Sequence, residues 1–592
     1  MNTDLTRKDL AIIIALGVST FLLYCYGLGN LEFFRHTEAD RTLIGWSMLE
    51  AGNFAIPNIL GTSIFTKPPL FYWIVAGAIY LSGNASEMAV RMPSIIIASL
   101  FVMTQYIILR KANFNSFLSF IGALFLCSSV QFARVADAVE IDMTFAFLCS
   151  TAFVLMFFAI SRASFKLILG SYAFAGLAFL TKGYPIIGFM GGITIVYYFL
   201  RIFIDVGQTH RSTPTINPLF VKFPRGLQKF VIWNCLGVIV FCLIISVWVY
   251  FVLQQPQGPT YLNEYLLGEF KNRIADSGGR KSAFFYLPVV LTSAAPWSIL
   301  LVIGLVVPFF RKLSQNSYRD YFLDKNYRNF FLFNLTVLLV GVVLLSIPAG
   351  KADRYFMPLL SATINLSVFG LIQIKNSKMP DYLYGIGKYL CIVLALVCAF
   401  FPVGYLTQAK FAAYIPMIEN TRYILLVLFL CGWFACIKKS KVINVAVIIL
   451  ALLAWRYIFA VLYVEARNKD YSVKNVVNVI DKAVPAEKPI YFEVNSVQRW
   501  FAYYLKRSGR NVYILSSAAV ENINNDMQSQ GEDEIYIVIN LGNFNKLKEE
   551  FAGKDGYQDL AFFPSGKHSV VLIKVNSSFL SKINTKQYIE WI

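Results

Sequence analysis

Long apolar segments recur along most of this chain of 592 residues. Most cover about 17–25 residues, the length that a helix needs to cross the hydrocarbon core of a bilayer. They are continuously apolar rather than alternating, so we expect membrane-spanning helices and not barrel strands. The segments lie near residues 10–29, 90–109, 116–133, 141–160, 167–181, 184–200, 230–253, 284–309, 329–348, 355–373, 384–407, 421–436 and 442–464.

The charges between these segments predict how the chain is threaded. Only 15% of its residues are charged, whereas soluble domains carry about 25%, and the formal net charge is +19. The basic residues gather in every second loop, which is typical of the cytoplasmic loops of membrane proteins and does not favour nucleic-acid binding. All the basic loops fall on the cytoplasmic side, as the positive-inside rule requires, if the short apolar segment 69–82 is a re-entrant or interfacial helix that does not cross the membrane. This predicts about thirteen spans, with the N-terminus inside and the C-terminus outside.

The last part of the chain has a different character. After residue 464 charged residues become frequent, and apolar runs such as "KPIYFEV", "NVYILSS", "EIYIVIN" and "SVVLIKV" have the length and composition of strands. Between them, "SVKNVVNVIDKAV" and "SVQRWFAYYLKRSG" have helical spacing. We therefore expect a transmembrane domain over residues 1–464, with outer loops 30–89 and 254–283, and a small outer α/β domain over 465–592.

The first outer loop holds a dense group of charged residues. The segment "FFRHTEADRTLIGWSMLEAGNF" contains Glu38 and Asp40, followed by apolar residues at helical intervals. This pattern favours an amphipathic helix lying on the membrane surface. A carboxylate beside such a helix suits chemistry on a lipid-linked substrate, and the alternative is a solvated cluster that neutralises itself.

The positive-inside rule makes basic residues unusual on the outer face, so those predicted to lie there are candidates for a function. Lys67 precedes two prolines, which stiffen the chain beside it, so its ammonium can meet a phosphate; the alternative is a lysine reaching for the interface. Asp142 begins a span, where a carboxylate is costly unless it is used. We expect such groups to form an anion-binding site with an acid or base beside it; the further candidates are Lys182, Arg273, Lys351, Arg354 and Tyr355.

The ordered set of motifs resembles a known family. "MLEAGNF", "KPPLFYW", "RMPS", "DM…AF", "GLAFLTKG", "FFYLPVVL…PWSIL" and "GK…RY…P" occur in this order. The set is similar to the polyprenyl-phosphate-dependent glycosyltransferases of the GT-C fold, above all the bacterial aminoarabinose transferases of lipid A, with protein O-mannosyltransferases as more distant relatives. The resemblance implies a multi-pass protein of the bacterial cytoplasmic membrane with a periplasmic C-terminal domain. It implies transfer from an undecaprenyl-phosphate sugar to a lipid, glycan or protein acceptor.

Residue by residue, the resemblance makes Lys67 the lysine that holds the carrier phosphate, Asp142 the second important acid, and Glu38 the second member of an Asp-Glu pair. The first member is Thr37 here, so either the acid has moved to Asp40 or Glu38 acts alone. Other positions also depart from the family: Thr66 replaces a glutamate, and Phe270 after Glu269 replaces a zinc-ligand histidine. With His36, His210 and His568 far apart in sequence, we expect no zinc and no other cofactor, although a different divalent metal stays open.

As a transferase, the chain would use cations to offset the charge on the leaving phosphate and a carboxylate to prepare the acceptor. The alternative is a lipid or sugar transporter or flippase of the envelope, which also has many spans with buried charge. A third possibility is a scaffold or ligase-type protein of envelope assembly. A transporter often shows repeated halves and charges near the midplane, and neither is visible in this sequence.

Overall fold

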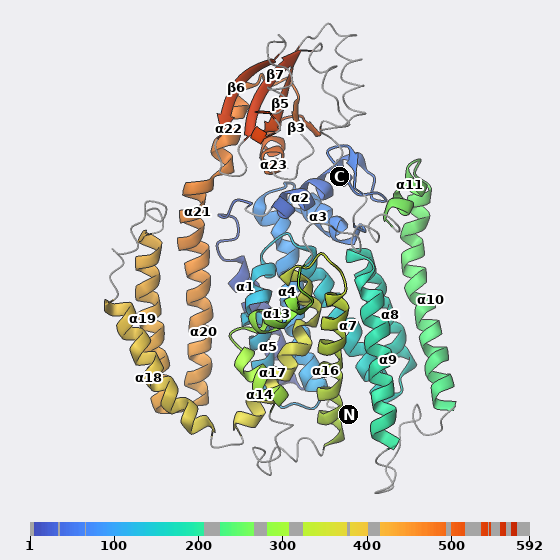
Figure 1. The fold of residues 1–592 in the computed structure, drawn as a ribbon, viewed down its shortest axis with the longest axis vertical. Helices are drawn as coiled ribbons and strands as arrows, with labels where there is room; N and C mark the ends of the chain where they lie inside the picture. Colours follow the sequence, from blue (N-terminus) through green and yellow to red (C-terminus); the bar gives the residue numbers. More distant parts are fainter. Residues whose placement is uncertain are drawn as a thin grey trace.

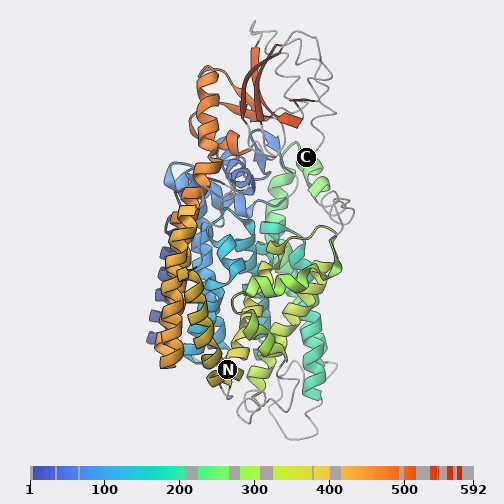
Figure 2. The ribbon, with the colours of Figure 1, turned by 60° about the vertical axis from the view of Figure 1, so that its left-hand side comes forward.

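The computed structural model describes residues 5–33, 36–64, 67–206, 225–265, 281–306, 324–375, 379–400, 415–492, 499–514, 534–542, 544–545, 557–563 and 570–576. These residues form an elongated bundle of helices with a five-stranded sheet at one end (Figure 1). The same arrangement is seen after a turn of the molecule in Figure 2, where the sheet continues the long axis of the bundle.

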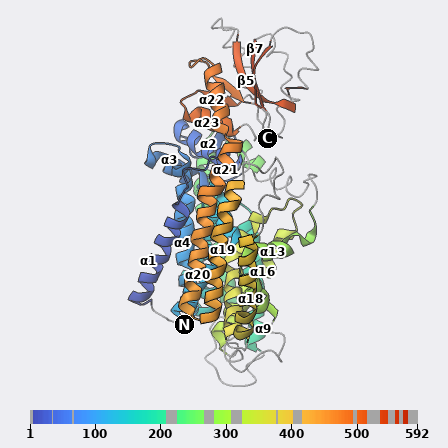
Figure 3. The same ribbon diagram turned by 90° about the vertical axis from the view of Figure 1, so that its left-hand side faces the viewer.

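Within the described ranges, ten helical segments are long and apolar enough to cross a membrane. They are α1 (Arg7–Cys25), α4 (Glu87–Lys111), α7 (Ile141–Arg162), α8 (Phe165–Lys182), α9 (Pro185–Val206), α10 (Arg225–Leu253), α16 (Lys325–Ser346), η4 (Asp353–Leu359) with α17 (Leu360–Lys375), α19 (Ile415–Lys438), and α20 (Lys441–Tyr457) with η7 (Ile458–Tyr463). Helix α1 lies beside α4 at the edge of the bundle (Figure 3). A multi-pass helical protein was predicted, and this class is confirmed.

Two predicted spans are bent instead of straight. Helices α5 (Ser116–Ser128) and α6 (Val130–Ala136) meet at 63°, because Ser129 between them has extended backbone angles. Helix α13 (Tyr286–Ala294), preceded by η2 (Ala283–Phe285), meets α14 (Ser298–Val306) at 117°, where Ala295 precedes Pro296 and so leaves the helical region. Counting each pair as one span gives twelve in the described part of the chain, against the thirteen predicted. Helix α18 (Met379–Phe400) covers part of the remaining one, and residues 401–407 lie outside the described residues.

Short elements gather at the end of the bundle that faces the sheet. They are α2 (His36–Ala51), β1 (Asn58–Ile59), β2 (Thr62–Ser63), α3 (Leu70–Ser82) and α11 (Gly258–Asn263). Helix α3 has 13 residues, which is too few to cross a bilayer core. This agrees with the loop charges, which predicted that segment 69–82 does not cross the membrane. It lies next to α2 (Figure 1).

The C-terminal region has the expected small α/β fold. Its sheet has the order β4-β3-β5-β7-β6, in which β4, β3 and β5 are parallel and β7 and β6 antiparallel. Four strands and two helices were predicted, and β6 is an addition whose polar residues hid it. The boundary at residues 464 and 465 stays a prediction, because η7 and α21 run on without a break there. The elements are α21 (Val464–Tyr471), α22 (Val473–Ala483), β3 (Ile490–Phe492), α23 (Arg499–Arg507), β4 (Val512–Ile514), β5 (Glu534–Asn540), β6 (Tyr557–Phe563) and β7 (Val570–Asn576).

Polar contacts, some of them buried, fix this region to the end of the bundle. Glu87, at the start of α4, accepts a hydrogen bond from the Tyr504 hydroxyl at 3.0 Å and pairs with Arg507. The Tyr504 hydroxyl in turn accepts the backbone N–H of Phe33 at 3.0 Å. Lys506 on α23 pairs with Glu50 on α2 at 2.8 Å. The α/β region therefore sits directly on the short elements that carry the predicted site.

Candidate active site

The charged residues of helix α2 have three different partners. Glu38 pairs with Arg91 on α4, Asp40 pairs with Arg499 on α23, and Arg41 pairs with Glu140 before α7. Glu38 and Arg41 are three positions apart and therefore lie on the same side of the helix, where both contact the segment before α7, whereas Asp40 is one and two positions from them and points elsewhere. The sequence predicted one charge cluster here, and the structure divides it.

Glu38 is completely buried, and both of its carboxylate oxygens accept hydrogen bonds. Its carboxylate accepts hydrogen bonds from Arg91 Nε at 2.9 Å, from Arg91 Nη2 at 3.2 Å and from the Val139 N–H at 3.1 Å. Arg91 also donates Nη1 to the carbonyl oxygens of Leu28 at 3.0 Å and Leu31 at 2.7 Å. The pair thus ties the end of α1, α2, α4 and the segment before α7 together, and Glu38 faces this junction.

Asp40 points towards the α/β region instead. Its carboxylate lies 3.1 Å from Arg499 Nη1. Burial raises the pKa of Asp40 to about 6, although Arg499 and Arg41 both favour its charged form. Asp40 is therefore an interface residue in this structure, and its neighbour Arg41 is the one that reaches the carboxylates described next.

Two carboxylates and three cations meet at the N-terminal start of α7, and we call them the charge cluster: Glu140, Asp142, Arg41, Lys182 and Arg354. Both carboxylates are almost completely buried, with 1% and 2% of their surface exposed. Arg41 pairs with Glu140 and Lys182 pairs with Asp142. Arg354 lies 3.8 Å from Glu140 and 3.9 Å from Asp142, between the two.

The charge cluster has one more positive than negative charge. Three cations face two carboxylates, so an arriving anion would be attracted. Arg354 keeps 38% of its side chain exposed and is the cation through which the cluster reaches solvent. Lys182 lies over the ring of Tyr355, 4.5 Å from its centre, and this contact holds the ammonium beside Asp142. Sequence reasoning had proposed Asp142, Lys182, Arg354 and Tyr355, and the structure brings all four together.

The chain around Lys67 adjoins the charge cluster. The Tyr261 hydroxyl donates to the Lys67 carbonyl oxygen at 3.1 Å, which positions the backbone of this half-buried lysine. Gly183, directly after Lys182, has a φ of +83°, and a side chain there would collide with the Tyr265 hydroxyl and approach Pro68. Tyr72 on α3 lies near both Arg41 and Tyr261. The Lys67 segment and the cluster therefore share their neighbours.

Lys351 does not join the charge cluster in the described structure. The Lys351 ammonium donates to the carbonyl oxygen of Lys281 at 3.2 Å, and the Lys281 ammonium donates to the Lys351 carbonyl oxygen at 2.7 Å. Arg273 lies outside the described residues, as do Glu269 and Phe270. Among the residues that are described, no three His, Cys, Asp or Glu side chains are close enough to hold a metal ion. The absence of zinc stays a prediction.

The sequence-based candidates omitted two members of the cluster and one neighbour. Glu140, two residues before Asp142, was not among the predicted site residues. Thr37 donates its hydroxyl to Glu140 at 2.9 Å, and Arg41 pairs with the same carboxylate. Thr37 and Arg41 are four residues apart on α2, so helical spacing placed them on one face and could have identified them.

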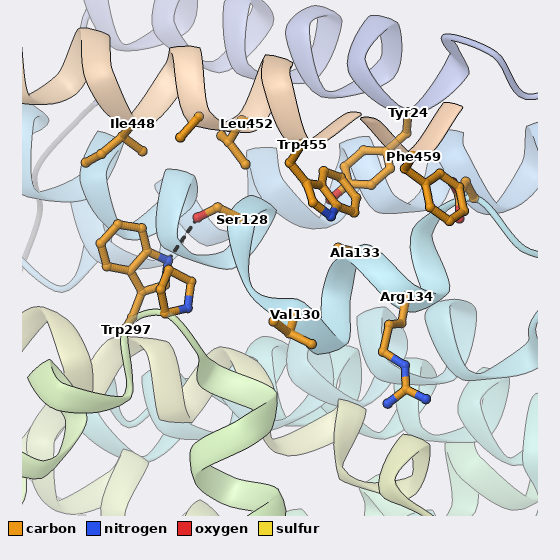
Figure 4. Close-up of a pocket in the computed structure, with 13 residues that line it drawn as sticks. Tyr24, Ser128, Val130, Ala133, Arg134, Trp297, Ile448, Leu452, Trp455 and Phe459 are labelled. Carbon is orange, nitrogen blue, oxygen red and sulfur yellow. Dashed lines mark hydrogen bonds between the residues drawn. The ribbon is translucent and has the colours of Figure 1, made fainter. Parts of the chain in front are cut away.

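An apolar pocket of about 460 Å³ opens between the bent pair α5–α6 and α20. Figure 4 shows Tyr24, Trp455 and Phe459 along one side and Trp297 at the opposite end, where its indole N–H donates to the Ser128 hydroxyl at 2.9 Å. Arg134 lies at the end nearer Phe459 and pairs with Asp353, the residue before Arg354. The pocket is thus apolar along its length and reaches a charged end next to the cluster.

Comparison with known proteins gives a consistent result. The family model for dolichyl-phosphate-mannose-protein mannosyltransferase matches residues 66–206. An undecaprenyl phosphate-alpha-4-amino-4-deoxy-L-arabinose arabinosyl transferase of Yersinia enterocolitica is 22% identical over 424 residues, which cover 70% of this chain and 68% of that protein.

Solved structures share the fold. The apo structure of ArnT from Cupriavidus metallidurans superimposes with a TM-score of 0.67 at 17% identity, covering 96% of this chain and 98% of that one. The structure of the same protein bound to undecaprenyl phosphate superimposes with a TM-score of 0.65 at 17% identity, covering 95% of this chain and 97% of that one. The predicted GT-C fold is confirmed.

Proposed function

We infer that this chain is a membrane glycosyltransferase of the GT-C type, related to the aminoarabinose transferases, that moves a sugar from a polyprenyl phosphate to a lipid, glycan or protein acceptor. The observation that carries this proposal is the charge cluster with its surplus cation, placed beside Lys67 at one end of a fold shared with ArnT. A lipid or sugar transporter is not favoured by these likenesses.

The reaction needs charge compensation at the leaving group. The acceptor oxygen forms a bond to the anomeric carbon of the sugar, and the bond from that carbon to the carrier phosphate oxygen breaks. The electron pair of this bond stays with the phosphate, so negative charge grows there. We assign Lys67 and Arg354 to this phosphate, because Arg354 is the exposed member of the cluster and Lys67 adjoins it. Lys351 and Arg273 stay further candidates.

A carboxylate of the charge cluster is a better candidate for the proton acceptor than Glu38. Asp142 is held by Lys182 and lies 3.9 Å from Arg354, which places its carboxylate close to the proposed phosphate site. It would take the proton of an acceptor hydroxyl, whereas an acceptor that is itself a phosphate would need no base. Glu140 binds Arg41 and Thr37 in the same cluster. Glu38 has both oxygens bound within a buried junction, so we assign it to positioning rather than to proton transfer.

The substrate carrier requires an apolar surface within the membrane. The pocket between α5–α6 and α20 offers space for part of a lipid chain, with Arg134 at its charged end (Figure 4). This position agrees with a substrate whose apolar chain lies in the bilayer and whose polar group lies near Arg354. We place the reaction on the outer face of the bacterial cytoplasmic membrane, with the N-terminus in the cytoplasm and the α/β region in the periplasm, because the basic loops follow the positive-inside rule.

The proposal is tested in two stages. Mass spectrometry of envelope lipids, glycans and glycoproteins from cells that lack the chain identifies the missing sugar and its acceptor. Transfer is then measured with purified protein in proteoliposomes, using the corresponding polyprenyl-phosphate sugar. Lys67→Ala should abolish transfer without changing expression or thermal stability. Lys482→Ala, an exposed lysine on α22, is the matched control and should leave transfer unchanged. Normal turnover in Lys67→Ala would contradict the role of Lys67.

A further inference from the structure

A second pocket, of about 300 Å³, lies between the end of α2, the β1–β2 hairpin and the segment that joins α10 to α11. Its polar side chains are Asn53, Asn58, Ser63, Gln255 and Gln257. None of the residues that line it is charged, although charged residues are frequent at this end of the molecule. The pocket therefore differs in chemistry from both the charge cluster and the apolar pocket.

Hydrogen bonds between the side chains fix the walls of this amide pocket. Asn53 Nδ2 donates to Gln255 Oε1 at 3.1 Å, and Asn53 Oδ1 accepts the Ala55 N–H at 3.0 Å. The Ser63 hydroxyl donates to Gln257 Oε1 at 2.8 Å. These bonds connect the first outer loop to the segment after α10, so the pocket is held open by contacts within its own rim.

The same bonds leave several polar groups available. Within the described part of the chain, no hydrogen bond engages the Asn58 amide or the amino groups of Gln255 and Gln257. A primary amide offers donors and an acceptor together, which matches the hydroxyl groups of a polyol. A phosphate is instead bound best by cationic side chains, and this pocket has none. Its volume is at the lower end of ligand sites, and so it suits a small ligand.

Both walls of the amide pocket lead to Lys67. The chain passes from Ser63 on β2 to Lys67, and on the other wall it passes from Gln257 into α11, where the Tyr261 hydroxyl binds the Lys67 carbonyl oxygen. A third contact fixes the same loop, because the Trp248 indole N–H donates to the Ala55 carbonyl oxygen at 2.9 Å. A ligand in the amide pocket would therefore contact two segments that both lead to the residue assigned to the carrier phosphate.

We propose that the amide pocket binds one neutral sugar unit of a saccharide, through Asn58, Gln255 and Gln257. The identity of that saccharide rests on the proposed function: it is either the sugar of the donor or a sugar of the acceptor. The shared chemistry is a ring that carries several hydroxyl groups and no charge at the position bound.

The binding test uses the full-length protein in lipid nanodiscs and a panel of methyl glycosides of neutral hexoses and pentoses. Saturation-transfer NMR measures which glycosides bind and how tightly. Asn58→Ala combined with Gln257→Ala should weaken the best glycoside about tenfold, because each lost hydrogen bond accounts for a factor of about 2 to 10. Gln254→Ala is the matched control: this exposed glutamine is the direct neighbour of Gln255 but does not line the pocket.

The outcomes separate the pocket from the proposed function. Binding of no glycoside, or equal binding by the double variant and Gln254→Ala, would overturn the proposal. Lys67→Ala should still bind the glycoside although it transfers no sugar; normal transfer by that variant would refute the proposed function and leave the measured binding in place. The transfer assay is then run with the double variant Asn58→Ala and Gln257→Ala. If its KM rises for the donor alone, the pocket binds the donor sugar; if its KM rises for the acceptor alone, the pocket binds a sugar of the acceptor.

Discussion

The buried pair of Glu38 and Arg91 allows the positioning role of Glu38 to be separated from a chemical one. Glu38 is 0% exposed and Arg91 1% exposed, so neither charge is solvated. Replacing Glu38 with glutamine leaves Arg91 as an uncompensated buried cation, which should lower the free energy of unfolding by about 3–5 kcal/mol. The change also weakens the contact to the Val139 N–H, which sets the position of Glu140 and Asp142.

Equilibrium unfolding in urea, with the protein in detergent micelles, measures the loss. Glu50→Gln on the same helix is the matched control: it removes an exposed pair with Lys506 and should cost less than about 1 kcal/mol. Adding Arg91→Gln to Glu38→Gln should make the combined loss smaller than the sum of the two single losses by about 0.5–3 kcal/mol. If Glu38→Gln unfolds like the wild type but has no transferase activity, Glu38 takes part in the chemistry and the positioning argument is wrong.

Two further predictions concern the other carboxylates. Asp142→Asn should slow transfer by about 100-fold or more, because it removes the proposed proton acceptor, while the exposed Asp481→Asn should not; equal rates in a proteoliposome assay would exclude Asp142. Asp40 has a folded-state pKa of about 6 against an ordinary 3.8, so the folded state holds its proton more tightly than the unfolded state. Stability from this group is present at low pH and is lost as the pH rises from about 4 to 6, with a slope of up to about 1.4 kcal/mol per pH unit. Asp40→Asn should flatten this decline in Tm, and parallel curves for the two proteins between pH 4 and 7 would contradict it.

The membrane-spanning helices were predictable because their cause is local. A run such as 141–160 is apolar over its whole length, and α7 follows it closely at Ile141–Arg162. The bends between α5 and α6 and between α13 and α14 were not predicted, since hydropathy does not register a single extended residue such as Ser129. Strand β6 was missed for a related reason: its pairing partner β7, rather than its own composition, makes it a strand.

The candidate site was only partly predictable. Lys182, Asp142 and Arg354 stood out because charged residues are rare at the outer ends of spans, and they do come together. Glu38 and Asp40 were predicted from the charged segment of the same loop, but they lie outside the charge cluster and have other partners. Charge alone predicted that these residues have a role, and it could not say with which partner, because the partners are contributed by α4, α23 and the segment before α7.

By itself the sequence determined a multi-pass helical protein with a small α/β region and carried the ordered motifs of a GT-C glycosyltransferase. These properties follow from apolar length and local spacing, which each segment holds within itself. Only the tertiary structure decided that Glu38 is bound within a buried junction, that Arg41 and Glu140 complete the charge cluster, and that five uncharged polar side chains from two separate segments form one pocket. Those outcomes depend on which helix faces meet across long sequence distances, and no single segment encodes the partner that it will contact.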